Sequence, residues 1–401
     1  MEDKVSKVRM SGPLTPFTFG FAGELRRVGY REHPICDQVR LMAHLSRWLS
    51  ARNLDVTDLT SEACHAFLDA RREAGYILWL SPKALEPLLQ YLRGIDALPP
   101  EPEIAPSPAA AVLEAYRQYL TSEKGLTAST ANGYIHLVHR FVGTRGRVAG
   151  EPDLRGLTAR DVTRYMVTHV VGHGSAKLTV TSLRSFLNFL HVNGVVDSSL
   201  GSAVPSVFGS RLAGLPQALE PGHIQRMLAS CDRNSVVGRR DFAVLTMLTR
   251  LGLRRGEVAA LDLEDVDWRS GDLVVRGKGD RLERLPLPDD VGRSIAAYLK
   301  RGRSACESRR LFLRVRAPHR GLSPAGVSAI VLGASVKAGL PRVGAHRLRH
   351  TAATAMLRAG APLSEIGQLL RHRSPLSTAI YAKVDRDALR DIARPWPGGA
   401  A

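Results

Sequence analysis

The residues with the clearest potential for chemistry lie between His346 and Tyr381, in the stretch HRLRHTAATAMLRAGAPLSEIGQLLRHRSPLSTAIY. His346, Arg349 and His350 are spaced i, i+3 and i+4, which places them on one face of a helix. The stretch ends with His372 and, nine residues later, Tyr381. Guanidinium and imidazole groups beside a tyrosine suggest a phosphate-binding site with a nucleophile next to it.

His346 and His350 would also have the spacing of a zinc-binding helix, which would make the protein a metallohydrolase. That motif needs a Glu after the first His, whereas here Arg347 and Arg349 intervene. Two arginines beside a dication are electrostatically unfavourable, and no acidic cluster is near them in the sequence. We therefore expect no metal site and no cofactor.

Two upstream residues could complete a phosphate site. Arg254, in GLRRGEV, begins a predicted helix, where an arginine can reach a phosphate that the helix N-terminus also favours. Glu257 could hold its guanidinium in place. Lys278 lies between glycines at a predicted hairpin tip, from which it could donate a proton to a leaving oxygen. Taken alone, each cation would more often be a solvated surface charge.

The elements that must position these residues form a mostly helical block with a small antiparallel sheet. DFAVLTMLTRL predicts a buried helix that ends at Gly252, and RRGEVAAL predicts a short helix after it. DVDWRSGDLVVRGKGDRLERLPLP alternates as strands do, with turns at 269–271 and 277–280. Helices are predicted again from about Pro288, with a break at Gly360.

Two further helical blocks precede this one. ALPPEPEIAPSPAA (97–110) contains five prolines and predicts a linker after residues 1–98. GSAVPSVFGSRLAGLP (201–216) predicts a second linker after the block 107–200. In the first block, Thr60 is a predicted N-cap, and Ser81 and Pro82 are the predicted N-cap and first residue of a third helix.

The first block resembles a partial copy of the second. LTSEACHAFL at Leu59 is similar to LTARDVTRYM at Leu157, and LLQYLRGIDAL from Leu88 is similar to FLNFLHVNGVV from Phe186. Both matches have an offset of 98 residues. We therefore predict an internal repeat.

The composition indicates a polyanionic partner. The 401 residues include 56 Lys and Arg against 38 Asp and Glu, a net charge of +18. Nucleic acid is the first candidate for this partner. An anionic membrane surface is less favoured as the partner, because the sequence has no polybasic run beside an apolar segment of membrane-spanning length. The N-terminus has no apolar segment typical of a signal peptide. The four cysteines are isolated from one another, which predicts reduced thiols of an intracellular protein.

Four motifs follow one another in the chain: GLRRGEV, GKG, HRLRH, and a His and a Tyr that are nine residues apart. This ordered set resembles the tyrosine recombinase (phage integrase) family. The resemblance covers residues 107–395. It implies a fold that is mainly α with a small antiparallel β-sheet, in three parts: a helical N-terminal module (1–98), a helical SAM-like core-binding domain (107–200) and an α+β catalytic domain (217–395). The module 1–98 lies outside what two-domain members share.

The resemblance also assigns the catalytic residues, which are Arg254, Lys278, His346, Arg349, His372 and Tyr381. Tyr381 would attack a DNA phosphodiester and form a 3′-phosphotyrosine, with His346 as its base or hydrogen-bonding partner and His372 at the phosphate. The two arginines would hold the phosphate oxygens, and Lys278 would protonate the leaving 5′-oxygen without any metal.

This sequence departs from the family pattern at two positions. Arg371 stands before the third-motif histidine, where the family often has Gly, and Arg347 lies inside the His-x-x-Arg motif. We expect both to add positive charge near the site.

The expected partner is double-stranded DNA, bound by a homotetramer on paired sites in the bacterial cytoplasm, in association with the nucleoid. DRDALRDIA (385–393) would dock on a neighbouring subunit. The expected activity is site-specific recombination for a mobile element, as an integrase or a transposase-like enzyme. The alternatives are a recombinase that resolves chromosome or plasmid dimers, and a non-catalytic DNA-binding protein on the same scaffold. A type IB topoisomerase would share the chemistry but not the core-binding domain.

Overall fold

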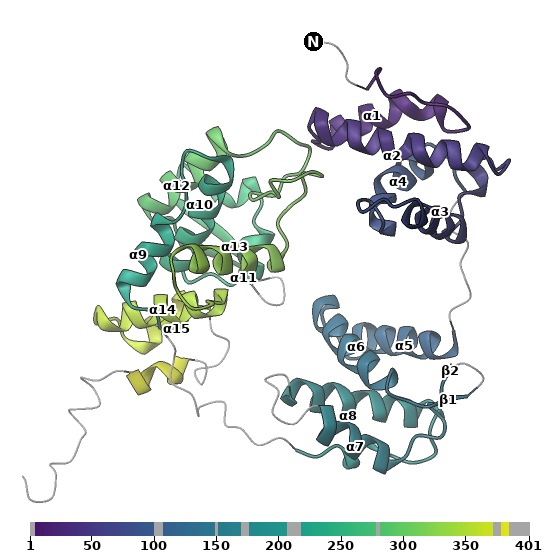
Figure 1. The fold of residues 1–401 in the computed structure, drawn as a ribbon. Coiled ribbons are helices and arrows are strands. Elements are labelled where there is room, and N and C mark those ends of the chain that lie inside the picture. The colour runs from purple at the N-terminus through teal and green to yellow at the C-terminus, as the bar shows by residue number, and fades with distance from the viewer. Residues whose placement is uncertain are drawn as a thin grey trace, which may run out of the picture. The chain divides into compact units, whose positions relative to one another are not determined.

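The structure is a computed structural model that describes residues 5–99, 107–148, 151–169, 176–206, 218–277, 281–371 and 378–384. Contacts divide the chain into two compact units, one formed by Met1–Glu101 with Gly214–Ala401 and the other by Pro102–Ala213. Figure 1 shows the helices of the N-terminal, middle and C-terminal parts. Each part contains its own cluster of buried hydrophobic residues. The predicted fold class, mainly α with a small antiparallel sheet, is confirmed.

The N-terminal part is helical, as predicted. It contains η1 (Thr15–Phe17), α1 (Thr18–Arg27), α2 (Glu32–Ser50), η2 (Val56–Asp58), α3 (Ser61–Glu73), η3 (Pro82–Ala84) and α4 (Glu86–Gly94). Thr60 is the N-cap of α3, and its hydroxyl accepts a hydrogen bond from the Ala63 amide at 3.3 Å. Ser81 and Pro82 are the N-cap and first residue of η3, as predicted, but η3 is only a 3-10 turn and the Ser81 side chain makes no cap hydrogen bond. Pro87 fits only the first turn of a helix, so α4 begins at Glu86.

The middle part contains a second helical bundle. Its elements are α5 (Pro108–Gln118), the π-helical turn η4 (Tyr119–Glu123), α6 (Ala128–Val142), β1 (Arg147–Val148), β2 (Glu151–Pro152), α7 (Ala159–His169), α8 (Ala176–Val192) and η5 (Gly201–Ala203). Helices α3 and α7 begin 98 residues apart, and α4 and α8 end 98 residues apart. These bounds agree with the offset of the internal repeat, which stays a prediction. Half of the first predicted linker (100–106) and most of the second (207–216) lie outside the described residues.

The C-terminal part contains the predicted three-stranded antiparallel sheet, in the order β3-β4-β5. Its elements are α9 (Pro221–Ala229), α10 (Val236–Arg250), α11 (Arg255–Ala260), η6 (Leu263–Asp265), β3 (Val266–Asp267), β4 (Asp272–Arg276), β5 (Leu282–Pro286), α12 (Asp289–Arg301), α13 (Pro324–Lys337), α14 (Ala345–Arg358), α15 (Leu363–Leu369) and η7 (Ile380–Val384). The helix breaks predicted at Gly252 and Gly360 are both present. Their φ angles are +58° and +86°, a region that glycine reaches without strain.

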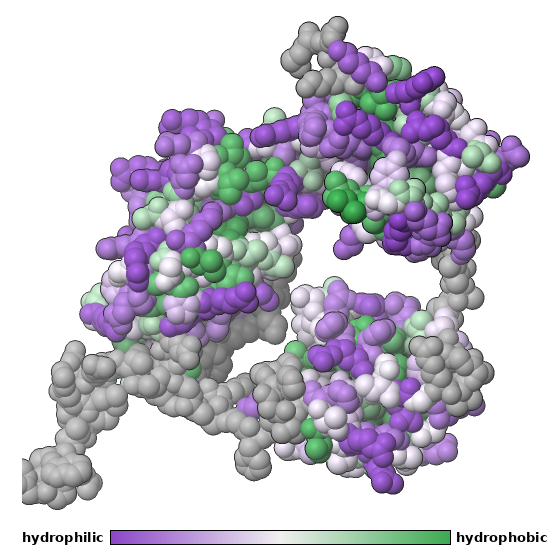
Figure 2. Space-filling view, viewed as in Figure 1, coloured by the Kyte–Doolittle hydropathy of each residue, from purple (hydrophilic) through white to green (hydrophobic). Residues whose placement is uncertain are grey.

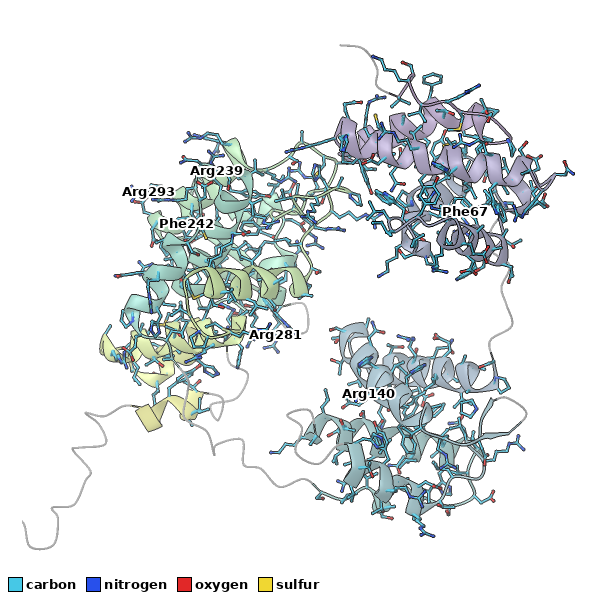
Figure 3. The ribbon with its side chains drawn as sticks, in the orientation of Figure 1. Phe67, Arg140, Arg239, Phe242, Arg281 and Arg293 are labelled. Carbon is cyan, nitrogen blue, oxygen red and sulfur yellow. The ribbon has the colours of Figure 1, made fainter. Side chains whose placement is uncertain are left out.

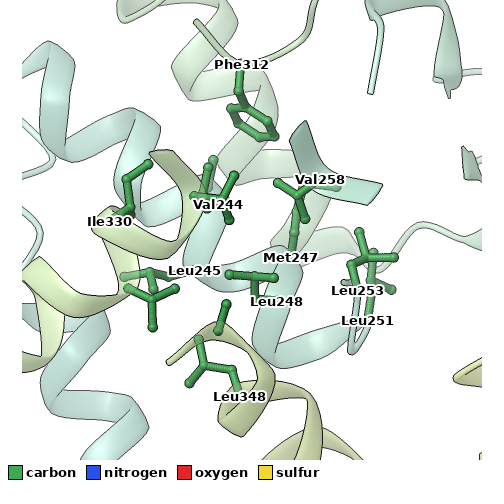
Figure 4. Packing of buried hydrophobic residues seen from close by; sticks show 14 of the residues in the cluster. Val244, Leu245, Met247, Leu248, Leu251, Leu253, Val258, Phe312, Ile330 and Leu348 are labelled. Atoms are coloured by element: carbon green, nitrogen blue, oxygen red, sulfur yellow. The ribbon is translucent and has the colours of Figure 1, made fainter. Parts of the chain in front are cut away.

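Hydrophobic packing fixes the orientation of α14, the helix that carries the HRLRH motif. Leu348 is fully buried in the C-terminal core, where it lies with Leu245 and Leu248 of α10 (Figure 4). Because Leu348 points into the core, the helix presents a different face with His346, Arg349 and His350. The core therefore sets the direction of the candidate catalytic side chains.

Polar residues cover much of the visible surface, with apolar patches between them (Figure 2). Within the described part of the chain, no helix combines the length and the hydrophobicity needed to cross a membrane. Three of the four cysteines, Cys36, Cys64 and Cys231, are buried, and all four are in the thiol form, as predicted.

Candidate active site

Arg254 is the residue from which α11 begins, and Glu257 holds it in place as the sequence suggested. The Arg254 amide donates to Glu257 Oε2 at 2.7 Å, and Arg254 Nη1 donates to Glu257 Oε1 at 2.6 Å. Arg254 Nη2 also donates to the Arg371 carbonyl at 3.2 Å. The Arg254 side chain remains 41% exposed, so a ligand can reach the guanidinium while its orientation is fixed.

Arg349 is almost completely buried, and its guanidinium joins three elements. Nη1 donates to the carbonyl of Gly252, after α10, at 2.6 Å, and Nη2 donates to the carbonyl of Leu370, after α15. Arg254 and Arg349 therefore donate to the adjacent carbonyls of Arg371 and Leu370. Burial, reinforced by the charge of Arg254, lowers the pKa of Arg349 to about 10, which still leaves it charged at neutral pH.

His346 and His350 lie one helical turn apart and touch edge to face. Their ring centroids are 4.4 Å apart, with 71° between the ring planes. Burial, followed by the charges of Arg349 and Arg254, lowers the pKa of His346. The pKa of His350 is lowered to about 4, mainly by burial and in addition by the neighbouring His346 and Arg349. Both imidazoles are therefore neutral at pH 7 and can accept a proton.

Tyr381, in η7, lies with its hydroxyl against His350. Its Oη is 2.9 Å from His350 Nδ1, and its ring packs with Ala353, Ile366 and Leu370. The residue is 1% exposed, and burial raises the pKa of its phenol, an effect that the charge of Arg349 opposes. The sequence suggested His346 as the partner of Tyr381, whereas the hydrogen bond found here joins Tyr381 to His350.

Arg371 is paired inside the protein, whereas the sequence led us to expect that it would add positive charge near the site. Its Nη2 donates to Glu257 Oε2 at 2.8 Å, and its Nε lies 3.8 Å from Glu283 Oε2 of β5. Burial alone would raise the pKa of Glu257, but Arg371, the Arg254 amide and the Arg254 guanidinium outweigh it and lower this pKa. Glu257 thus remains ionised and compensates the Arg371 charge.

Lys278 and His372, the remaining two predicted site residues, lie outside the described residues, as does the segment 385–393. Arg281 is the first described residue after the hairpin tip, immediately before β5 (Figure 3). The ion pair between Arg371 and Glu283 therefore joins the hairpin that carries Lys278 to the residue that precedes His372.

The described part of the site combines two fixed guanidiniums, two neutral imidazoles and a phenol. Guanidiniums bind phosphate oxygens, and a phenol beside a neutral imidazole can act as a nucleophile, so the arrangement suits phosphoryl transfer. Within the described ranges no group of three or more His, Cys, Asp or Glu is placed to hold a metal ion. Sequence reasoning did not assign His350 a catalytic role, although its i+4 spacing from His346 put it on the correct face.

Comparisons with known proteins agree with this chemistry. The model of the Phage integrase family matches residues 217–387. A protein of Sinorhizobium fredii (strain NBRC 101917 / NGR234) that is named as an integrase/recombinase is 40% identical over 97% of this chain and 96% of its own length. Tyrosine recombinase XerD of Listeria monocytogenes serotype 4b (strain F2365) is 28% identical over 71% of this chain and 98% of its own.

Among solved structures, that of a lambda integrase(75-356) dimer bound to a COC' core site superposes with a TM-score of 0.52. It is 17% identical in sequence, and the match covers 72% of this chain and 97% of that one, which shows a shared fold. The sequence relatives extend that conclusion from fold to family. The chain belongs to the phage integrase family, the tyrosine-type site-specific DNA recombinases.

Proposed function

We propose that this recombinase cuts and rejoins double-stranded DNA through a 3′-phosphotyrosyl intermediate at Tyr381. The observation that carries the proposal is the convergence of Arg254, Arg349 and Tyr381 on the end of α15. The two arginines donate to the carbonyls of residues 371 and 370, and the tyrosine ring packs against Leu370. Three segments that are far apart in the chain thus deliver two phosphate-binding groups and a nucleophile to one place.

In this mechanism the Tyr381 oxygen attacks phosphorus and the bond from phosphorus to the 5′-oxygen breaks. Arg254 and Arg349 would stabilise the charge that develops on the non-bridging oxygens. Lys278 would protonate the leaving 5′-oxygen, and His372 would contact the phosphate. The phosphotyrosine conserves the phosphoester bond, so that a 5′-hydroxyl of another strand can reverse the reaction without an energy source.

The remaining parts of the chain would bind the DNA. We assign residues 107–200 to a core-binding domain and residues 217–395 to the catalytic domain, in line with the fold shared with lambda integrase, whose structure holds a core site. The net charge of +18 favours phosphate contacts, which would make binding dependent on salt. A homotetramer on two paired sites, with residues 385–393 docked on a neighbour, would exchange the strands.

A mobile-element integrase or transposase-like role is favoured over dimer resolution. The integrase/recombinase relative aligns over 97% of the chain, whereas the XerD relative aligns over 71% and at lower identity. The chain thus shares almost its whole length with the first protein and only part with the second. Its place of action would be the bacterial cytoplasm, at the nucleoid, because its substrate is there.

The test uses nicked duplexes that tile the DNA flanking the gene, in which the strand released by cleavage diffuses away and religation is blocked. The wild-type chain should form a covalent protein–DNA adduct on one of them, also in excess chelator, and Tyr381→Phe should form none while it binds the same duplex. An adduct formed by Tyr381→Phe would refute the nucleophile. Binding without any adduct would favour the non-catalytic alternative.

A further inference from the structure

The contact between His350 and Tyr381 points to a role that the family resemblance did not assign. We propose that His350 is a catalytic residue that accepts the phenolic proton of Tyr381 as this tyrosine attacks the phosphodiester. The inference rests on the proposed function, because it requires Tyr381 to be the nucleophile. It transfers to His350 the role that the sequence suggested for His346.

The Tyr381 hydroxyl and its proposed acceptor, His350 Nδ1, are already in contact in the absence of DNA. The distance of 2.9 Å between Oη and Nδ1 is that of a hydrogen bond. The Tyr381 ring is held by Ala353 of α14 and by Ile366 and Leu370 at α15, which leaves the hydroxyl little freedom. His350 is held in turn on α14, where its ring lies 4.4 Å from that of His346. A base that already touches the proton it removes needs no reorganisation before the reaction.

The surrounding charges keep His350 in the form that can accept. The groups that face it are His346 and Arg349 on its own helix and Tyr381 from η7. Burial and these neighbours lower the pKa of His350 to about 4, so the ring is neutral at pH 7. A neutral ring with its proton on Nε2 offers the lone pair of Nδ1 to the phenol. A bound phosphodiester adds negative charge, which favours the imidazolium that forms during attack.

The step balances. The Oη–H bond breaks and the proton moves to Nδ1 of His350 while the bond from Oη to phosphorus forms. The bond from phosphorus to the 5′-oxygen breaks, and that oxygen takes its proton from the general acid, for which we proposed Lys278. In religation the 5′-hydroxyl attacks phosphorus and returns its proton to the deprotonated general acid, while the His350 imidazolium returns its proton to the departing tyrosine oxygen. General-base catalysis of this kind contributes roughly 10²–10⁴-fold.

Asparagine separates proton transfer from simple positioning. The Oδ1 of Asn can stand near the place of His Nδ1 and accept the same hydrogen bond, but it is not basic at any working pH. His350→Asn should therefore keep Tyr381 oriented while it removes the base. His346→Asn, one turn away on the same helix, tests the alternative that His346 is the base.

The experiment measures single-turnover formation of the adduct by the full chain on the nicked flanking duplex. His350→Asn should lower the rate constant by about 10²-fold or more at unchanged DNA affinity, and raising the pH should partly restore it as tyrosinate forms. A second duplex carries sulfur in place of the bridging 5′-oxygen, because a thiolate leaves without a proton. The sulfur substitution should restore adduct formation by Lys278→Ala but not by His350→Asn.

Four outcomes would overturn the inference. Cleavage by His350→Asn within a few-fold of wild type would leave His350 only an orienting role, and a large loss in His346→Asn alone would return the base to His346. A ¹⁵N chemical shift that places the His350 proton on Nδ1 at pH 7 would mean that the imidazole donates to Tyr381 instead of accepting; this measurement needs neither DNA nor a variant. Adduct formation by Tyr381→Phe would refute the proposed function itself, and the role of His350 with it.

Discussion

Arg371 and Glu257 form an ion pair of 2.8 Å in which the arginine side chain is 2% exposed and the carboxylate 5%. The same carboxylate accepts hydrogen bonds from the amide and the guanidinium of Arg254. One buried group therefore connects the start of α11 to the residue that precedes His372. We infer that Glu257 positions both arginines and that its charge balances theirs.

Glu257→Gln should be among the most destabilising single changes in the catalytic part. The variant removes the near counter-charge of the buried Arg371 guanidinium and leaves only Glu283, 3.8 Å from Nε. Breaking one half of a buried pair costs about 3–5 kcal/mol. Chemical denaturation at pH 7 measures the loss. The double variant Glu257→Gln with Arg371→Met should recover part of it, because the orphaned charge is then gone.

Glu264→Gln is the matched control for this prediction. Glu264 pairs with Arg309 on the surface, where the two side chains are 58% and 67% exposed, and such pairs contribute little to stability. Equal losses in Glu257→Gln and Glu264→Gln would contradict a special role for the buried carboxylate.

The backbone at Arg371 provides a second prediction. Arg371 has a φ of +56°, a conformation that costs most residues about 1 kcal/mol and costs glycine nothing. Arg371→Gly and Arg371→Ala both remove the ion pair, but only glycine also removes the strain. The glycine variant should therefore be more stable than the alanine variant by about 1 kcal/mol in denaturation experiments. Equal stability would mean that the backbone at this position stores no strain.

Much of the site was predictable from local sequence, because local spacing determines local contacts. The three-residue spacing of Arg254 and Glu257 predicted their contact, and the glycines at 252 and 360 marked the helix ends. The turns at 269–271 and 277–280 likewise located the three strands.

Contacts between distant segments were not predictable in this way. His350 and Tyr381 are 31 residues apart, and the spacing of His350 from His346 equally fits a metal-binding helix or a pair of unrelated imidazoles. Arg371 was expected to add positive charge near the site, because Glu257, which neutralises it, lies 114 residues earlier. Only the folded chain brings these partners together.

Gly252→Ala should disturb the site through the backbone. Gly252 has a φ of +58°, and a Cβ added there would lie 2.6 Å from Leu370 Cδ2. The Gly252 and Leu370 carbonyls both accept from Arg349, so a displacement would move this guanidinium. We expect a stability loss of at least about 1–2 kcal/mol, and slower adduct formation.

Gly256→Ala is the control for the effect of an added methyl group. Gly256 lies in α11, has open space around its Cβ position and has no positive φ. Alanine should leave stability unchanged or raise it by up to about 1 kcal/mol, because it favours helix more than glycine does. A Gly252→Ala variant as stable and as active as Gly256→Ala would show that the Gly252 conformation is dispensable.

Stability should fall as the pH is lowered from 7 to 5, and His350 should account for part of the fall. Its pKa is about 4 in the folded protein and about 6.5 in an unfolded chain. Between these values the unfolded chain binds more protons, so the stabilisation is complete above pH 6.5 and is lost as the pH falls toward 4. Equilibrium denaturation at pH 7 and pH 5 should differ by about 1–2 kcal/mol more in the wild type than in His350→Asn.

The quantity compared is the change in unfolding free energy between pH 7 and pH 5. His350→Asn also alters the contact with Tyr381, but that effect is present at both pH values and cancels in the difference. His346 lies beside His350 and has its pKa lowered in the same direction, so His346→Asn should reduce the pH dependence as well. His139→Asn, at an exposed position in α6, should leave it unchanged. If His350→Asn retained the full pH dependence of the wild type, the pKa of the His350 imidazole would not be lowered in the folded protein.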